Sequence, residues 1–236
     1  MANKFGARMA NTVALSFKNT PLRAKHGETV VTGLPLRKQI SELALMKKNP
    51  QIRNQNAQKY GLDSDLPILV VTGGSLGAQH INEVVAQCAQ EILDSGFQVL
   101  HICGKGKIDE VQAQTAQVRG TYQVLEYAAN IDEIYSFADL VITRAGAGMV
   151  CEVSALGIPA VFVPLAVGNG EQALNAKDLV EAGGAILIPD NEFNTDVLRE
   201  KVLPLLALEK LTAMASKARA AARIDAAAQL AAVILQ

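Results

Sequence analysis

The stretch that decides the fold is "LPILVVTGGSLGAQHINEVVAQCAQEIL", residues 66–93. It begins as an apolar run, passes through a cluster of glycines, and continues with helical spacing over residues 79–93. An apolar run without strict alternation is typical of a strand buried on both faces of a parallel sheet. Glycines between such a strand and a helix let the backbone approach a ligand, and the helix start offers free N–H groups to a phosphate. An ordinary tight turn between strand and helix is the alternative interpretation.

The same pattern repeats along the chain. Further strands are predicted at residues 97–103, 122–127, 138–143, 159–165 and 185–189, and helices at residues 108–118, 130–138, 147–157 and 171–183. Strands that alternate with helices predict βαβ units, right-handed crossovers and a parallel sheet covered on both faces. The expected fold class is therefore α/β, with a doubly wound parallel sheet.

We expect four parts along the chain. Residues 1–38, too few for a domain, read as the tail of an amino-terminal domain, and residues 39–63 as a polar helical linker. Residues 64–204 form the doubly wound domain, and residues 205–236 are Ala-rich carboxyl-terminal helices.

Composition excludes several classes of function. Half of the 236 residues are hydrophobic and 19% are charged, which supports a sizeable core. A net charge of −1 and the absence of Trp argue against nucleic-acid binding. The three cysteines are scattered, which suggests neither zinc nor disulfides and fits a cytoplasmic location. The chain shows no signal peptide, and its apolar stretches are too short for a membrane span.

A second glycine loop, "TRAGAGMVCE" at residues 143–152, repeats the design of the first. Gly146 and Gly148 open the predicted helix, and Glu152 lies slightly more than one turn into it. A carboxylate there can accept two hydrogen bonds from the vicinal diol of a ribose. The alternative is a glutamate that merely favours the helix dipole. Two phosphate-type loops on one sheet favour a nucleotide diphosphate as the ligand more strongly than one such loop would.

The third motif is "PLAVGNGEQALNA", residues 164–176. Its Glu171, Gln172 and Asn175 offer carboxylate and amide groups at a loop-to-helix start, which suits sugar hydroxyls. Ordinary helix capping by Asn169 is the alternative.

No metal or cofactor is expected. The "DSD" at residues 63–65 imitates a D-x-D motif that can hold Mn²⁺, but it precedes the first strand, at the sheet edge away from the ligand. His80 is predicted to be a solvated helix residue. His101 lies in a predicted buried strand and is expected to be a satisfied core histidine.

The segments "GGSLGA", "ADLVITRAGAGMVCEVSALGIPAVFVPL" and "GNGEQALNA", in this order, resemble the MurG family of bacterial glycosyltransferases, which belong to glycosyltransferase family 28. The resemblance runs over nearly the whole chain and is most specific in the middle. It implies the GT-B architecture of two Rossmann-like domains. This chain would supply the carboxyl-terminal, UDP-sugar-binding domain with a remnant of the amino-terminal one.

The resemblance also implies roles for single residues. Ser75, beside Gly74, and Arg37 would contact the diphosphate, which Gly148 and Met149 would face from the helix start. The main chain at Ala128 would read the uracil edge, with Ile131 stacked over the base, and Glu152 would take the ribose hydroxyls. Glu171 and Gln172 would hold the sugar hydroxyls, as the residue chemistry also suggests for Asn175. Family members often carry a Gln pair at Glu171–Gln172 and a His at Val167, which bears on selectivity for the sugar's 4-hydroxyl epimer.

The implied function is transfer of N-acetylglucosamine from UDP-N-acetylglucosamine to lipid I, giving lipid II for peptidoglycan biosynthesis. No catalytic residue is expected in this chain, because the family's candidate base and its acceptor surface lie on the amino-terminal domain. The chain alone would bind donor without turnover. Peripheral association with the cytoplasmic face of the membrane would belong to the full-length protein. The alternatives are an enzyme like UDP-N-acetylglucosamine 2-epimerase and a non-catalytic UDP-sugar-binding module.

Overall fold

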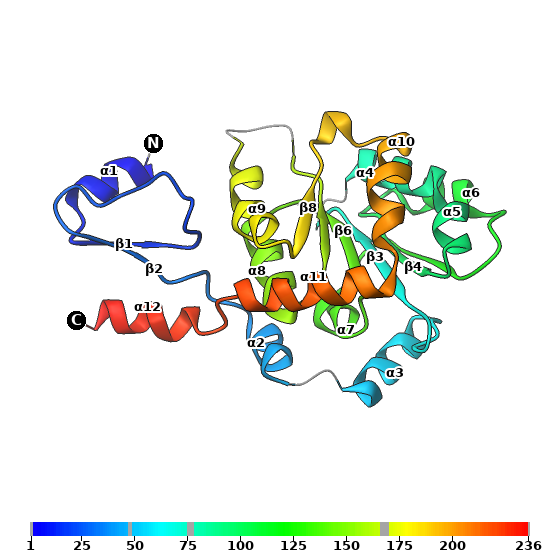
Figure 1. Ribbon diagram of the computed structural model, residues 1–236, viewed down its shortest axis with the longest axis horizontal. Coiled ribbons are helices and arrows are strands. Elements are labelled where there is room, and N and C mark those ends of the chain that lie inside the picture. The colour runs from blue at the N-terminus through cyan, green and yellow to red at the C-terminus, as the bar shows by residue number, and fades with distance from the viewer. Residues whose placement is uncertain (1, 47–48, 75–77, 166–169, 236) are drawn as a thin grey trace.

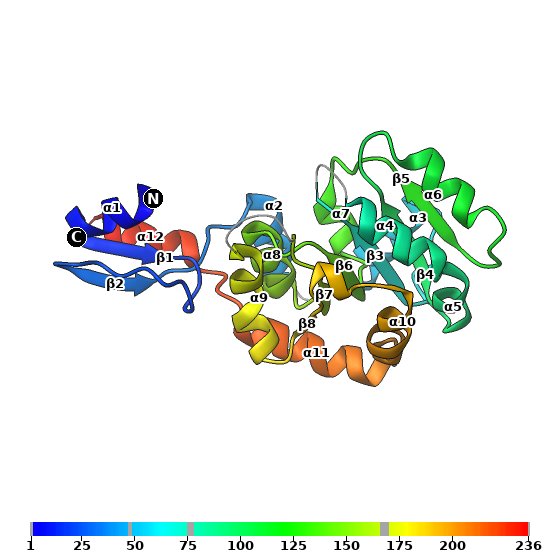
Figure 2. The ribbon, with the colours of Figure 1, turned by 90° about the horizontal axis from the view of Figure 1, so that it is seen from above.

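The computed structural model describes residues 2–46, 49–74, 78–165 and 170–235. They form a large α/β domain and a smaller lobe beside it (Figure 1). The lobe contains α1 (Ala2–Met9), β1 (Thr12–Leu15) and β2 (Glu28–Val31), and the carboxyl-terminal α12 (Ala226–Ile234) returns to the same side (Figure 2). β1 and β2 pair in parallel.

The large domain is built on a parallel sheet. Its described strands are β3 (Ile68–Thr72), β4 (Gln98–Ile102), β5 (Tyr122–Leu125), β6 (Leu140–Thr143), β7 (Ala160–Phe162) and β8 (Ala185–Leu187). Their order is β5-β4-β3-β6-β7-β8, and every neighbouring pair is parallel. In the register, Val70 of β3 lies opposite Leu100 on one side and Val141 on the other. The predicted strands and the predicted doubly wound sheet are thus confirmed.

Helices cover both faces of the sheet. They are α4 (Gln79–Gln87), α5 (Ala89–Asp94), α6 (Ile108–Thr115), α7 (Ile131–Tyr135), α8 (Ala147–Leu156), α9 (Glu171–Glu181), α10 (Thr195–Val197) and α11 (Leu208–Ala221), with single turns at Asp190–Glu192, Leu198–Val202 and Leu203–Leu205. The helical pattern predicted over residues 79–93 is divided between two helices, α4 and α5. The chain leaves helical geometry at Cys88, where φ is −98° and ψ is 11°. There the Cys88 N–H is shared between the carbonyls of Val84 and Val85, which tightens the turn.

Successive residues of β3 point to opposite faces and so belong to two cores. Ile68 and Val70 pack with buried side chains of α7, α8 and α9. Leu69 and Val71 pack instead with α4, α5 and the segment that leads into α11. All four side chains are fully buried, which explains why the strand reads as an uninterrupted apolar run.

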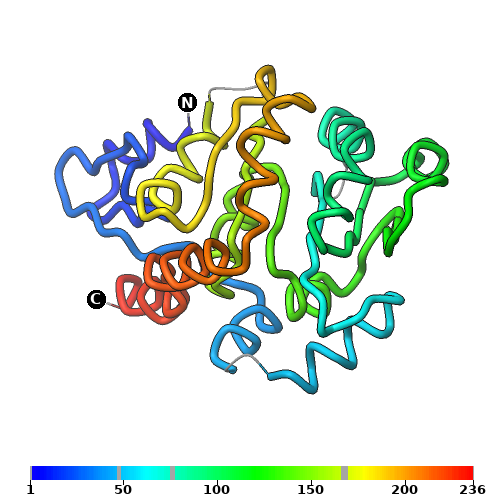
Figure 3. Tube along the Cα trace, turned by 45° about the vertical axis from the view of Figure 1, so that its right-hand side comes forward, coloured from blue at the N-terminus to red at the C-terminus, as the bar shows by residue number. Residues whose placement is uncertain are grey.

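The segment predicted to be a linker contains two helices, α2 (Lys38–Leu45) and α3 (Pro50–Lys59), which lie together at one end of the large domain (Figure 3). Arg53 fixes α3 to the sheet. Its guanidinium donates to the carbonyls of Ser64, Leu66 and Phe137 and pairs with Asp139 at 2.8 Å. Through these contacts α3 is attached to the residues that precede β6. Within the residues described, no helix is both long and apolar enough to cross a membrane.

Candidate nucleotide-sugar site

The two glycine loops meet at the centre of the sheet. β3 and β6 are neighbours, and the chain runs outward from them in opposite directions, through β4 and β5 on one side and β7 and β8 on the other. Thr72 and Thr143, which end the two strands, are paired in the register. In open α/β sheets, ligands bind outside the carboxyl ends of the strands at such a switch point.

The glycines of both loops border open space. A Cβ added at Gly74, Gly146 or Gly148 would meet no atom within 4 Å, whereas one at Gly184 would lie 2.7 Å from the Ala218 Cα. Gly74 has a φ of +82°, which side chains rarely adopt. Among the residues that the structure describes, no side chain caps the start of α4 or of α8. First-turn N–H groups without such a cap are suited to bind a ligand. Ser75, Val167 and Asn169 lie outside the described residues.

Glu152 lies on α8 and is nearly buried, with 10% of its side chain exposed. Both carboxylate oxygens are occupied by Arg37, which precedes α2. Arg37 Nε donates to Oε1 at 2.8 Å, and Nη2 donates to Oε2 at 2.8 Å. Two residues predicted to contact different parts of a nucleotide therefore contact each other. Nothing local in the sequence signalled this pairing, because 115 positions separate the two residues.

Three further predicted residues, Ala128, Ile131 and Met149, are partly buried and pack against the same core cluster. Tyr135, at the end of α7, donates its hydroxyl to the Met149 Sδ at 2.7 Å and so joins α7 to the start of α8. Burial raises the pKa of Tyr135, and the nearby Glu152 carboxylate raises it further, so the phenol stays protonated.

Gln172 and Asn175 tie α9 to the second glycine loop. The Gln172 amide oxygen accepts from the N–H groups of Ala145 at 3.2 Å and Leu165 at 2.9 Å. The Asn175 amide donates to the Ala145 carbonyl at 3.1 Å. Glu171 is the first residue of α9 and is exposed. The three predicted sugar-binding residues are thus brought beside the loop that ends β6, and two of them also fix its backbone.

Sequence reasoning missed a charged cluster at the same sheet edge. Arg144 donates to the carbonyls of Val163 and Pro164 and pairs with Asp190. His80, on α4, lies 3.4 Å from the same Asp190 carboxylate and is only partly exposed, so the prediction of a solvated helix residue is incomplete. The cluster fastens the ends of β6, β7 and β8 together. The sequence offered one signal for this cluster, because Arg144 and Asp190 each come directly after a predicted strand.

His101, in contrast, is the satisfied core histidine that was predicted. It is fully buried in β4, with Nδ1 2.7 Å from the Tyr122 hydroxyl and Nε2 3.0 Å from Asn82 Oδ1. Burial lowers its pKa to about 3. At the amino ends of the strands, Asp63 accepts from the Asp65 N–H. The described residues hold no group of three or more His, Cys, Asp or Glu placed to bind a metal.

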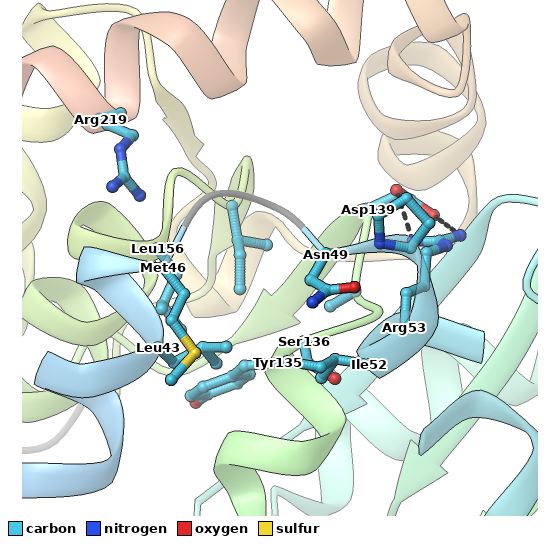
Figure 4. A pocket seen from close by; sticks show the side chains of 13 residues that line it. Leu43, Met46, Asn49, Ile52, Arg53, Tyr135, Ser136, Asp139, Leu156 and Arg219 are labelled. Atoms are coloured by element: carbon cyan, nitrogen blue, oxygen red, sulfur yellow. Dashed lines mark hydrogen bonds and ion pairs between the residues drawn. The ribbon is translucent and has the colours of Figure 1, made fainter. Parts of the chain in front are cut away.

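A separate cavity of about 340 Å³ lies at the amino ends of the strands (Figure 4). Leu43, Met46 and Ile52 line it from the linker, and Tyr135 and Leu156 from the large domain. In Figure 4 the Arg53–Asp139 pair closes one side. Because Asp139 precedes β6, this cavity lies away from the carboxyl ends of the strands where the glycine loops gather. The cavity lies between the segment that holds α2 and α3 and the rest of the large domain.

The six described parallel strands and the two open glycine loops at their switch point match the carboxyl-terminal domain of a GT-B glycosyltransferase. Residues 68–230 match the model of the glycosyltransferase family 28 C-terminal domain. The chain therefore belongs to glycosyltransferase family 28.

Several curated relatives match the whole chain, and two of them serve as examples. A protein of Nocardioides sp. is 44% identical over 237 residues, and one of Paenarthrobacter aurescens is 40% identical over 238 residues. Both are named UDP-N-acetylglucosamine–N-acetylmuramyl-(pentapeptide) pyrophosphoryl-undecaprenol N-acetylglucosamine transferase. The match covers 100% of this chain but 63% and 62% of the two relatives, so the chain spans less than two thirds of their length.

Solved structures agree with the fold. The crystal structure of Acinetobacter baumannii MurG has a TM-score of 0.77 and 30% sequence identity, covering 100% of this chain and 62% of that one. UDP-GlcNAc 2-epimerase from Neisseria meningitidis, bound to UDP-GlcNAc, has a TM-score of 0.62 at 18% identity, covering 88% of this chain and 55% of that one. The second likeness shows a shared fold.

Proposed function

We propose that this chain binds UDP-N-acetylglucosamine at the carboxyl ends of β3 and β6. One observation carries the proposal. Two helices begin there with no cap from a described side chain, behind glycines that border open space, and a nearly buried carboxylate lies slightly more than one turn into the second helix. Helix starts favour a diphosphate as the ligand. A carboxylate such as that of Glu152 has two acceptor oxygens and so favours a vicinal diol. The names of the curated relatives and the likeness to MurG support a nucleotide sugar as the ligand.

In this proposal each predicted residue has one task. Gly74, Ser75 and Arg37 hold the diphosphate, which Gly148 and Met149 face from the start of α8, and Glu152 holds the ribose. The main chain at Ala128 reads the uracil edge, and Ile131 stacks over the base. The packing of Ala128 and Ile131 against one core cluster supports this assignment. Glu171, Gln172 and Asn175 hold the sugar hydroxyls, for which their place beside the Ala145 turn is suited.

For the whole protein we propose transfer of N-acetylglucosamine to lipid I at the cytoplasmic face of the membrane. An acceptor hydroxyl attacks C1 of the sugar, the bond from C1 to the diphosphate oxygen breaks, and UDP leaves. The starts of α4 and α8 stabilise the negative charge that develops on the leaving diphosphate. A base takes the acceptor proton, and we assign it to the amino-terminal part that the longer relatives possess. This chain alone is expected to bind donor without turnover.

The test is calorimetric titration of UDP-N-acetylglucosamine into the purified chain and into its Glu152→Ala variant. Losing hydrogen bonds to a charged group costs roughly 1.5–3 kcal/mol, which is about ten- to a hundredfold in affinity. The matched control is Glu181→Ala, which removes an exposed carboxylate from α9 that pairs only with Lys177 among described residues.

Donor binding by the parent and the Glu181 variant, with loss in the Glu152 variant, supports the proposal. UDP-N-acetylgalactosamine, added as competitor, reports on selectivity for the 4-hydroxyl. If the parent and Glu152→Ala bind the donor with equal affinity, Glu152 does not hold the ribose. Epimerisation of the donor at C2 by the parent would instead assign the site to an epimerase.

A further inference from the structure

Arg37 and Glu152 occupy each other's hydrogen-bonding groups in the ligand-free chain. The guanidinium presents Nε and Nη2 to the two carboxylate oxygens, each at 2.8 Å. A vicinal diol would approach a carboxylate in the same two-pronged way, with one hydroxyl on each oxygen. The arginine therefore blocks the face of Glu152 that a ribose needs.

We propose that Arg37 is a specificity-determining residue that closes the ribose site to nucleosides and opens it to nucleoside diphosphates. This inference rests on the proposed function. A uridine must break the Arg37–Glu152 pair and offers the guanidinium nothing in return. UDP breaks the same pair but gives the guanidinium a diphosphate, with which arginine forms charge-assisted hydrogen bonds.

The positions of the two side chains support such an exchange. Arg37 is 55% exposed and Glu152 is 10% exposed, so the guanidinium lies on the solvent side of the carboxylate. Arg37 sits at the extended residue before α2, with a φ of −60° and a ψ of 147°. Among the residues described, Glu152 is the only group to which its side chain hydrogen-bonds. The guanidinium can therefore leave without disturbing α2.

The decisive experiment compares uridine and UDP on the parent and on Arg37→Met, which keeps an apolar stem of similar length. Uridine affinity is measured by competition against UDP-N-acetylglucosamine. We expect uridine to bind Arg37→Met roughly tenfold or more tightly than the parent, and the preference for UDP over uridine to fall. The gain should shrink for 2′-deoxyuridine, which lacks one of the two hydroxyls. Unchanged or weaker uridine binding by Arg37→Met would overturn the inference, because it would mean that Arg37 only orients Glu152.

The matched control is Lys38→Met, which removes the same charge from the adjacent position. Lys38 is 85% exposed and pairs with Glu42, so its loss should leave the ratio of UDP to uridine affinity unchanged. Arg37→Lys, which keeps the charge but has no two-pronged fork, should give an intermediate gain for uridine.

A second measurement needs no variant. Salt screens an exposed guanidinium, so raising sodium chloride from about 50 to about 500 mM should strengthen uridine binding to the parent while weakening UDP binding. Parallel weakening of both ligands would count against the exchange. A parent chain that binds neither UDP nor UDP-N-acetylglucosamine would overturn the proposed function itself. A parent that binds UDP, with no gain for uridine in Arg37→Met, would overturn only the role of Arg37.

Discussion

His101 is a buried residue whose ionisation links stability to pH. Burial lowers its pKa from 6.5 to about 3, while in the unfolded chain it titrates near its ordinary value. Between these values the unfolded state binds a proton that the folded state does not, so stability falls as pH falls below about 6.5. We expect this residue to cost about 1.4 kcal/mol of unfolding free energy per pH unit in that window. Urea unfolding of the parent and of His101→Gln at several pH values will measure the difference in slope.

The matched control is His26→Gln, because His26 is exposed. Its stability should follow the parent's pH dependence. If the parent and His101→Gln lose stability in parallel between pH 6 and 4, the assignment of the slope to His101 is wrong.

At the scale of the element, the glycine that ends α8 contributes to the stability of the fold. Gly157 closes it in the left-handed region at a φ of 65°, and a Cβ there would lie 3.2 Å from the Ala215 carbonyl oxygen on α11. Gly96 has a comparable φ of 87°, but a Cβ there would meet nothing within 4 Å. Backbone strain costs about 1–2 kcal/mol in both, and overpacking adds about 1–3 kcal/mol at Gly157 alone. We therefore expect Gly157→Ala to be the more destabilising in denaturant unfolding. Equal losses would show that α11 yields to the added methyl group.

At the scale of the whole molecule, Asp178 of α9 connects the large domain to the lobe. Its carboxylate accepts from the Lys18 N–H at 3.1 Å and from the Asn19 amide. We expect Asp178→Ala to speed amide hydrogen exchange at Lys18 while leaving β3 unchanged, because the sheet does not depend on this contact. The control is Glu181→Ala on the same helix. Unaltered exchange at Lys18 would mean that the lobe is held by other contacts.

The sequence predicted those features that local pattern determines. Apolar runs placed the strands, and glycines placed the open loops at Gly74 and Gly146. It did not predict the pairing of Arg37 with Glu152 or of Arg144 with Asp190, because such pairs depend on how separate elements pack. The helix break at Cys88 was also missed, since the apolar spacing continues on both sides of it. The distribution of tasks among the site residues stays a prediction.

The chain passes between the lobe and the large domain twice, once before α2 and once before α12. The two passages touch, since a Cβ at Gly33 would lie 3.0 Å from the Cβ atoms of Arg223 and Ala226, and Arg223 also donates to the Val31 carbonyl. Two passages that adjoin act as one short crossing. Once the contacts of Asp178 and Phe17 with the other part of the molecule open, the lobe should therefore turn about this crossing while staying attached to the large domain.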